Sequence, residues 1–401
     1  MKTFIKIISV LLILSPLMAK ERHIILAQGD IWRPLLAPNL IQNHDYIEDL
    51  PFSGFIMAGN SFTNDTMKPG ETLTYRYVWK ELHGLRNLYK KKTENFLLIN
   101  IRFPADYWDD NAWERVARNF GVVARAAKNL GFKGIAIDDE GYGAENRKMI
   151  NFQFPKEDDV AENPQNYNTW ERAGSQPSWV DRRSYRNPKY TFEEHIDKVT
   201  ERFNDIMEEM QEEDNFPGIT VLVYYGPSFA HENTNKENLI LTDLGKANSQ
   251  EMKGAIFLGM QEALKGNSSL HDMGENYKYR KDRHFKNSYM LRKYKIATQE
   301  YNEDLNPQYQ WKIPKKDWFS WSRKVQVGFM TSNITHTSHY AEYYTKGRSG
   351  EASDIQYALK KALKYTDKYV VYYCQNQNWL QPDGINAVDD EWYDMMEELA
   401  K

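Results

Sequence analysis

Three consecutive acidic residues, Asp138, Asp139 and Glu140, directly follow a short apolar run at residues 134–137. An apolar run that ends in carboxylates is typical of a buried strand that brings acids to the rim of a sheet. Because crowded carboxylates repel one another, we expect at least one pKa to rise toward the range that a general acid needs. The alternative is that Asp138 and Asp139 cap the following turn and that Glu140 is a solvated side chain.

The elements that must position these acids follow a regular order. Eight short runs rich in Ile, Val, Phe and Tyr alternate with longer amphipathic stretches, which indicates βα units and a parallel sheet. The expected strands are residues 23–27, 54–58, 96–102, 134–138, 219–225, 254–258, 325–331 and 369–374. The expected helices are residues 35–46, 73–89, 111–130, 192–213, 236–247, 352–365 and 389–400.

This order predicts an α/β protein with a single (β/α)₈ TIM barrel over residues 20–401. Residues 141–190 and 265–321 are expected to be two long insertions at the rim, because they show no clear periodicity. An open, doubly wound sheet is the alternative. The chain has no G-x-G-x-x-G after its first strand and no P-loop, which excludes the usual nucleotide-binding open sheets.

The C-terminal ends of the strands form the active-site face of such a barrel, and the residues there are polar or aromatic. These side chains can donate or accept hydrogen bonds with hydroxyl groups and offer flat faces to sugar rings. The predicted substrate contacts are Asn60, Arg102, Tyr142, Tyr225, His336, Gln375 and Trp379.

The fourth strand resembles that of TIM-barrel glycoside hydrolases, and most closely the family-eighteen chitinases, whose strand reads D-x-x-D-x-D-x-E. The residues that fit this pattern are Phe132, Gly134, Ile135, Ile137, Asp138, Glu140 and Tyr142. Lys133 and Ala136 stand in place of the first two acids, and the sixth strand lacks the family's Met-x-Tyr-Asp. The resemblance implies that Glu140 is the catalytic acid/base and that Asp138 orients Glu140 or influences its charge state. It also implies that Trp379 stacks on a sugar.

Hydrolysis by two carboxylates needs a second acid about 5–9.5 Å from the first. Glu262 is predicted for this role, because the expected sixth strand at residues 254–258 would bring it to the rim. The alternative is that Glu262 is a first-turn acid of the next helix, where the helix dipole favours it. Asp106 and Glu342 are the further candidates for the second acid.

The sequence therefore predicts a glycoside hydrolase that cleaves an extracellular oligo- or polysaccharide by carboxylate acid/base catalysis. Two alternatives stay open. The protein is a non-catalytic carbohydrate-binding barrel if the acids missing at Lys133 and Ala136 are essential, or a polysaccharide lyase if His336 or Tyr225 abstracts a proton. We expect no cofactor and no metal, since His336 and His339 lack companion ligands, and no G-x-S-x-G motif indicates a serine nucleophile.

The overall charge is mixed and slightly negative, −4 at pH 7. This charge argues against a nucleic-acid partner. Cys374 is the single cysteine, so no disulfide can form within the chain. No segment after residue 19 is apolar enough to be expected to span a membrane. The sequence does not indicate an oligomeric state.

We predict that residues 1–19 are a signal peptide and that the protein is secreted or periplasmic. Lys2 and Lys6 precede an apolar run at residues 7–14, and Ala19 ends a plausible cleavage site. N-terminal sequencing of the exported protein should begin near Lys20. Recovery of an exported chain that still begins at Met1 would contradict this prediction.

Overall fold

The computed structural model describes residues 21–28, 36–68, 70–101, 106–139, 190, 192–224, 253–274, 281–295, 315–333, 352–374, 377–382, 384 and 387–400.

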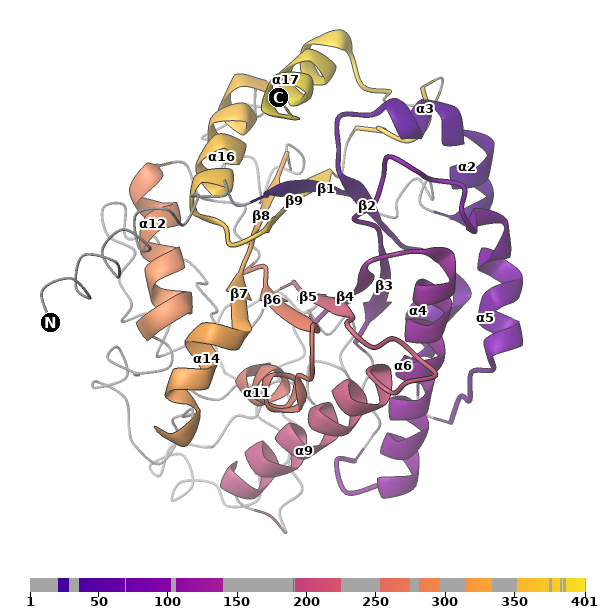
Figure 1. Cartoon of the computed structure of the whole chain (residues 1–401), viewed down its shortest axis with the longest axis vertical. Helices are drawn as coiled ribbons and strands as arrows, with labels where there is room; N and C mark the ends of the chain where they lie inside the picture. Colours follow the sequence, from indigo (N-terminus) through magenta and orange to yellow (C-terminus); the bar gives the residue numbers. More distant parts are fainter. Residues whose placement is uncertain are drawn as a thin grey trace, which may run out of the picture.

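The strands form one parallel sheet that curves into a ring (Figure 1). They are β1 (His23–Gln28), β2 (Gly54–Met57), β3 (Phe96–Asn100), β4 (Gly134–Asp138), β5 (Thr220–Val223), β6 (Ser269–Asp272), β7 (Val325–Val327), β8 (Phe329–Ser332) and β9 (Tyr369–Cys374). Their spatial order is β7-β6-β5-β4-β3-β2-β1-β9-β8, and every pair in the ladder is parallel.

The ring closes through a strand that changes partner. Gly328 alone separates β7 from β8, so these two segments are one continuous stretch of chain. The first half pairs with β6 and the second half with β9, which in turn pairs with β1. Counting β7 and β8 as one strand gives the eight strands of a closed barrel, and the predicted TIM barrel is confirmed.

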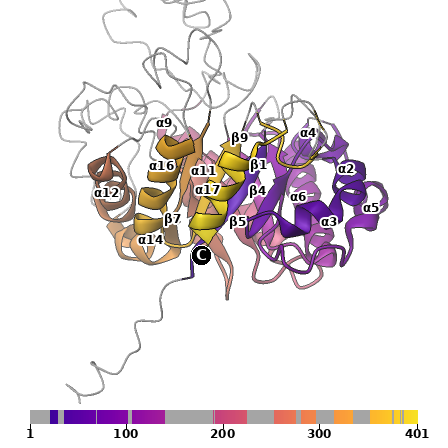
Figure 2. The ribbon, with the colours of Figure 1, turned by 90° about the horizontal axis from the view of Figure 1, so that it is seen from above.

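Helices surround the ring and follow the strands in sequence (Figures 1 and 2). Figure 2 shows α2, α3 and α5 on one side of the strands and α12, α14 and α16 on the other. The α-helices are α2 (Ala37–Gln42), α3 (His44–Asp49), α4 (Ser61–Asp65), α5 (Tyr75–Leu82), α6 (Asp110–Leu130), α9 (Phe192–Met210), α11 (Lys253–Ala263), α12 (Asp282–Met290), α14 (Trp318–Lys324), α16 (Ala352–Tyr365) and α17 (Asp390–Ala400). The short 3₁₀ and π segments are η2 (His83–Leu85), η4 (Leu291–Lys295) and η6 (Lys315–Asp317).

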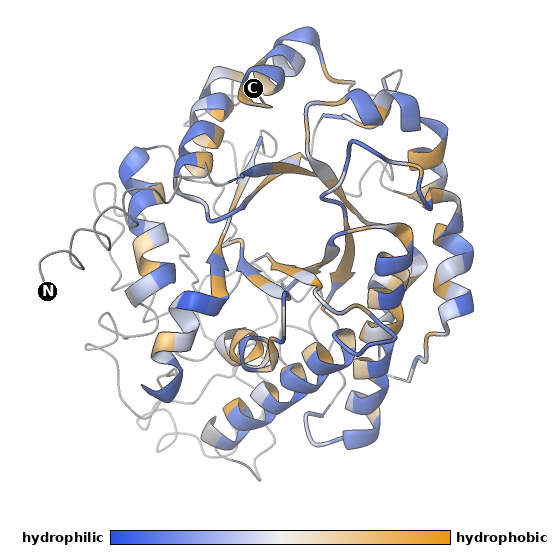
Figure 3. Ribbon diagram, in the orientation of Figure 1, coloured by the Kyte–Doolittle hydropathy of each residue, from blue (hydrophilic) through white to orange (hydrophobic). Residues whose placement is uncertain are grey.

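Helix α6 shows how local sequence sets these boundaries. Asp109 caps its N-terminus, accepting a hydrogen bond from the Ala112 amide at 3.0 Å, and Gly131 ends it in a left-handed conformation with φ 79°. Apolar residues at helical spacing, such as Trp113, Val116 and Phe120, are buried against the barrel. Figure 3 shows the same division, with hydrophobic residues gathered in the strands and hydrophilic ones on the outer faces of the helices.

Contacts across the ring identify the inner face of each strand. The ring of Tyr369 on β9 lies 4.8 Å from His271 on β6 and 5.6 Å from Phe96 on β3, centroid to centroid. Neither β6 nor β3 is a neighbour of β9, so these three side chains meet inside the barrel. Because side chains alternate along a strand, every second residue from each of them also faces inward.

The expected sixth strand was wrong. Residues 254–258 lie in helix α11, and the sixth strand is β6 at Ser269–Asp272. The apolar run is buried because α11 packs inside the molecule with Ala255, Ile256, Phe257 and Leu258 all covered. A helix buried on every side lacks the polar face that reveals a helical period.

The expected rim insertion at residues 265–321 was consequently wrong as well, because it contains β6 and α12 and reaches into α14. Most of the other expected insertion, residues 141–190, lies outside the described residues. The same is true of the helix expected at residues 236–247.

A buried ion pair holds the ring closed where β7 meets β8. Arg292, in the π-helical segment η4, donates from Nη1 to the Asp272 carbonyl at 2.8 Å and to the Asp272 Oδ1 at 3.2 Å. Its Nη2 donates to the Gly328 carbonyl at 2.6 Å, and the Gly328 amide donates to the Asp272 carbonyl at 2.8 Å. The two charged side chains are 1% and 0% exposed.

We predict that Arg292→Met destabilises the protein by about 3–5 kcal/mol, because it leaves the Asp272 carboxylate buried without its cation. Denaturant unfolding followed by circular dichroism measures this loss. The matched control is Arg118→Met, since the Arg118 guanidinium is 62% exposed and pairs with Glu114 at 3.9 Å. That exposed pair should contribute less than about 1 kcal/mol, and equal effects of the two variants would contradict the assigned role of Arg292.

Candidate active site

The C-terminal ends of the strands gather inward-facing polar groups on one side of the barrel. On β3 the inner face runs from Phe96 through Leu98 to Asn100. The ladder then places Asp138 of β4 beside Asn100 and, by alternation from Leu222, Tyr224 after β5 beside Asp138. An amide, a carboxyl and a phenol thus follow one another around the mouth of the barrel.

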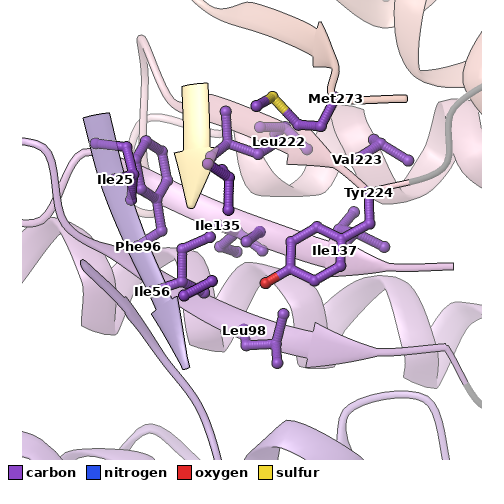
Figure 4. Packing of buried hydrophobic residues seen from close by; sticks show 14 of the residues in the cluster. Ile25, Ile56, Phe96, Leu98, Ile135, Ile137, Leu222, Val223, Tyr224 and Met273 are labelled. Carbon is purple, nitrogen blue, oxygen red and sulfur yellow. The ribbon is translucent and has the colours of Figure 1, made fainter. Parts of the chain in front are cut away.

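Below this mouth the inner faces of β3, β4 and β5 are apolar. Leu98, Ala136 and Leu222 stand in register on β3, β4 and β5. Figure 4 shows this packing, with the ring of Tyr224 extending from β5 toward the side of Ile56. Beneath the polar groups of β3, β4 and β5, the inner face of these three strands is therefore apolar.

Asp138 is the carboxyl that the structure places on this inner face. It ends β4, is only 6% exposed, and its carbonyl accepts a hydrogen bond from the Ile101 amide at 2.9 Å. The next residue, Asp139, is 1% exposed and, by alternation, belongs to the opposite face of the strand. The sequence-based expectation that Asp138 lies at the rim of the fourth strand agrees with this placement.

Two asparagines support the neighbouring strand ends. The Asn100 Nδ2 donates to the Asn64 Oδ1 of helix α4 at 3.0 Å. Asn60, a predicted substrate contact, stands just before α4 and is 4% exposed, with its Nδ2 3.4 Å from the Ala58 carbonyl. Asn60 is thus at the end of the second strand, as expected.

Several predicted site residues lie outside the described residues. They are Glu140, Arg102, Tyr142, Tyr225, His336 and Gln375, together with His339 and Glu342.

Glu262 does not lie at the rim where the sequence placed it. It is near the C-terminal end of helix α11, next to Gln261, whose carbonyl accepts a hydrogen bond from Lys324 at 3.2 Å. Lys324 directly precedes β7, so Glu262 is at the N-terminal side of the barrel, opposite the mouth. Burial, followed by the charge of nearby Asp317, raises the pKa of Glu262. Because of this placement, Glu262 is not the partner of the strand-four acids.

Asp106, the fallback for the second acid, follows β3 on the side of the mouth. Its Oδ1 accepts a hydrogen bond from the Trp108 amide at 3.0 Å, and its carbonyl accepts one from the Trp113 indole at 2.9 Å. These bonds organise the turn that leads into α6.

Trp379 is built into the wall of the barrel. Its ring is 0% exposed and packs edge-on against Phe52 at 5.0 Å and Tyr372 at 6.2 Å between centroids. Tyr372 faces away from the barrel interior, since Tyr369 and Tyr373 on the same strand face inward. The Trp379 amide also donates to the Gln28 Oε1 at 3.2 Å. The expected sugar-stacking role does not fit a ring covered by these neighbours.

Sequence reasoning missed the inward-facing Asn100 and Tyr224. Tyr224 was passed over for Tyr225, although the alternation that separates Asp138 from Asp139 also separates the two tyrosines. The apolar run of the fifth strand does not indicate which of its faces points inward, because Val221, Leu222 and Val223 are apolar and buried on both faces.

The described residues contain no group of three His, Cys, Asp or Glu side chains placed to hold a metal ion. In the same part of the chain, no helix is both long and apolar enough to cross a membrane. Burial raises the pKa of the Cys374 thiol to about 12, which keeps this thiol protonated and unreactive at neutral pH.

No protein-family model matches the sequence, and a search of curated proteins found no significant match. Among solved structures, the chain is similar to glycoside hydrolases. It is 11% identical to a β-mannanase from the blue mussel Mytilus edulis, with a TM-score of 0.40 over 94% of this chain and 92% of the mannanase. It is 8% identical to a broad-specificity GH5-4 endoglucanase from an uncultured bacterium, with a TM-score of 0.43 over 92% and 86% of the two chains.

A GH18 chitinase from Pseudoalteromonas aurantia is 12% identical, with a TM-score of 0.32 over 89% of this chain and 97% of the chitinase. The strand order, rather than these similarities, establishes the fold.

We predict that Trp379→Ala costs about 3–5 kcal/mol of stability, as is typical for removal of a buried aromatic ring. Denaturant unfolding measures the loss, and Trp108→Ala, at a half-buried tryptophan after β3, is the comparison and should cost less. A Trp379→Ala protein of unchanged stability that had lost its affinity for glycans would restore the sugar-stacking role.

Proposed function

We propose that the protein is a glycoside hydrolase whose catalytic acids are Glu140 and Asp138. The observation that carries this proposal is the position of Asp138, a buried carboxyl on the inner face of β4 at the C-terminal mouth of a closed barrel. This is the face on which barrel enzymes carry their catalytic groups. Glu140 follows two residues later in the sequence, outside the described residues.

In this proposal Glu140 protonates the oxygen of the leaving sugar, and Asp138 shares the proton of the pair. Asn100 and Tyr224 flank Asp138 and would contact the sugar hydroxyls. The substrate would be an oligo- or polysaccharide outside the cell, in keeping with the signal peptide predicted at residues 1–19.

A second candidate function is glycan binding without cleavage. One observation favours it: of the inward-facing side chains that the structure describes at the strand ends, only Asp138 carries a carboxyl, because Glu262 lies at the opposite end of the barrel. A reducing-end assay across a panel of soluble polysaccharides separates the two candidates, since a binding protein releases no new ends.

We predict that Glu140→Gln removes nearly all glycan cleavage and leaves the fold intact. An amide of the same shape cannot supply the proton, and such a transfer contributes about 10²–10⁴-fold to the rate. The matched control is Asp139→Asn, which changes a carboxyl on the opposite face of the strand and should reduce activity little.

The reducing-end assay on the best substrate of the panel measures both variants. If Glu140→Gln kept most of the activity while Asp139→Asn abolished it, the assigned side of the strand would be wrong. If neither variant lost activity, the strand-four acids would not be the catalytic groups.

A further inference from the structure

The outer side of the barrel beside β6 and β7 gathers exposed apolar side chains. Six large hydrophobic side chains are exposed in the described part of the chain, and three of them lie there: Met290 of α12, Tyr294 of η4 and Phe319 of α14. They are 42%, 47% and 71% exposed. A fourth, Tyr357, lies on α16, which stands next to α12 (Figures 1 and 2). Exposed apolar groups that gather on one side of a protein indicate an interaction surface.

Helices α12 and α14 contribute to one outer face. The Trp321 indole of α14 donates to the Arg292 carbonyl of η4 at 3.5 Å, and η4 continues α12 directly. Figures 1 and 2 both show the two helices on the same side of the ring. Phe285 of α12 and Trp321 of α14 are buried against the barrel, so the opposite side of each helix faces outward.

The outward side of α12 and η4 is a stripe of mixed character. Its exposed residues are Arg283, Lys286, Met290 and Tyr294, which follow one another at the three- or four-residue spacing of a helix. At about 1.5 Å per residue the stripe is about 16 Å long. Cations thus occupy its beginning and apolar groups its end.

The exposed rings stand beside cations. The Arg323 guanidinium carbon lies 5.2 Å from the centroid of the Phe319 ring on α14. On α16 the Lys361 Nζ lies 5.1 Å from the centroid of the Tyr357 ring. A flat ring offers an apolar surface to a sugar, and a neighbouring cation offers hydrogen bonds to an anionic group on it.

The face formed by α12, η4, η6 and α14 carries positive charge that nearby acids do not neutralise. Asp282 of α12 is paired with Lys361 and Lys364 of α16, at 3.3 and 3.0 Å, and the Asp317 carboxyl lies beside that of Glu262. Six exposed cations of this face form no ion pair within the described part of the chain: Lys281, Arg283, Lys286, Lys315, Lys316 and Arg323. The whole chain has a net charge of −4, so this basic face is a local feature that attracts anions.

We propose that the outer face of α12, η4, η6 and α14 binds an acidic polysaccharide, a polymer whose sugars carry carboxylate or sulfate groups. The choice of a polysaccharide rests on the proposed function, which it extends to a second site. Because α14 leads into β7, this face lies on the outer wall of the barrel and not at the C-terminal mouth. It would hold the protein on a polymer while the mouth acts on a chain of that polymer.

An anionic membrane is the other surface that attracts cations and apolar groups. A helix that lies in a membrane interface presents a wide apolar face along its length. The exposed stripe of α12 instead begins with Arg283 and Lys286 and has a single apolar residue, Met290, before η4. Separate rings beside cations fit sugars that carry charges better than they fit a lipid surface.

Isothermal titration calorimetry with polygalacturonate tests the proposal, and the methyl ester of the same polymer is its uncharged control. Dextran sulfate and dextran test a sulfate ligand in the same way. We expect binding to an acidic polymer that weakens as salt is added. The double variant Arg283→Glu and Lys286→Glu should weaken this binding about tenfold, because it reverses two charges at the site. Phe319→Ala should weaken it about three- to tenfold through loss of the ring.

Helix α5, on the opposite side of the ring (Figure 1), offers matched controls. Arg76 and Lys80 are exposed there, and the double variant Arg76→Glu and Lys80→Glu changes the net charge by the same amount. Tyr77 is 38% exposed, so Tyr77→Ala is the control for Phe319→Ala. All of these positions are on the surface, where substitutions change stability little, and the control variants should bind the acidic polymers as the unaltered protein does.

Binding to neither acidic polymer, or equal binding to an acidic polymer and its uncharged control, would overturn the proposal. Equal losses in the α5 variants would overturn it too, because net charge alone would then explain the binding. Tighter binding to phosphatidylglycerol vesicles, lost in the α12 and α14 variants, would identify a membrane surface instead.

The calorimetry requires no cleavage, so its outcome is independent of the proposed function. A protein that binds an acidic polymer through this face but releases no reducing ends would reject the proposed function and retain the second site. A protein that cleaves glycans but binds no acidic polymer would do the reverse. Where both hold, the α12 and α14 variants should slow the cleavage of the polymer and leave that of short oligosaccharides unchanged.

Discussion

Arg292 and Lys293, two consecutive cations in the π-helical turn η4, hold the strand that closes the barrel. Arg292 joins Asp272 of β6 to the carbonyl of Gly328, where β7 gives way to β8. Lys293 donates to the Val325 carbonyl at 2.7 Å and to Asp367 Oδ2 at 2.9 Å, just before β9. The same Asp367 oxygen accepts the Val327 amide at 2.9 Å. One turn of chain thus fixes both partners of the seventh strand, and the remaining ladder depends on that closure.

Closure of the barrel determines which side chains can face the C-terminal mouth. Once the ring is complete, each strand has an inner face, which the contacts of Tyr369 with His271 and Phe96 identify. Alternation along the strands then determines which residues lie on that face. Asp138 must then point into the mouth and Asp139 away from it, although the two acids are adjacent in sequence. The chemistry that we propose depends on this difference between two neighbouring carboxyls, because the closed barrel makes one face of the strand the inside of the mouth.

Much of this could be read from the sequence. Seven of the eight strands were found because their apolar runs are buried on both faces, and β4 was placed at its observed bounds. The sixth strand could not be found in this way. Its residues Ser269, His271 and Asp272 are polar, and their hydrogen-bonding groups find partners inside the fold. Ser269 bonds Thr220, His271 bonds Ser269, and Asp272 bonds Arg292. Tertiary partners that satisfy polar groups in a strand leave no trace in local hydropathy. Glu262 followed that error, since its position was inferred from the misplaced strand.

Trp379 illustrates a different limit of prediction from the sequence. The sequence shows an aromatic residue after the last strand, and only packing reveals on which side of the wall its ring lies.

The central claim, that the strand-four acids face a glycan at the C-terminal mouth, is tested most directly by a crystal structure of the Glu140→Gln protein soaked with oligosaccharides. The account predicts a sugar at the mouth, with its glycosidic oxygen within hydrogen-bond distance of residue 140 and with Asp138 and Asn100 beside it. A glycan bound only at the N-terminal side near Glu262, or only on the outer helices, would contradict it.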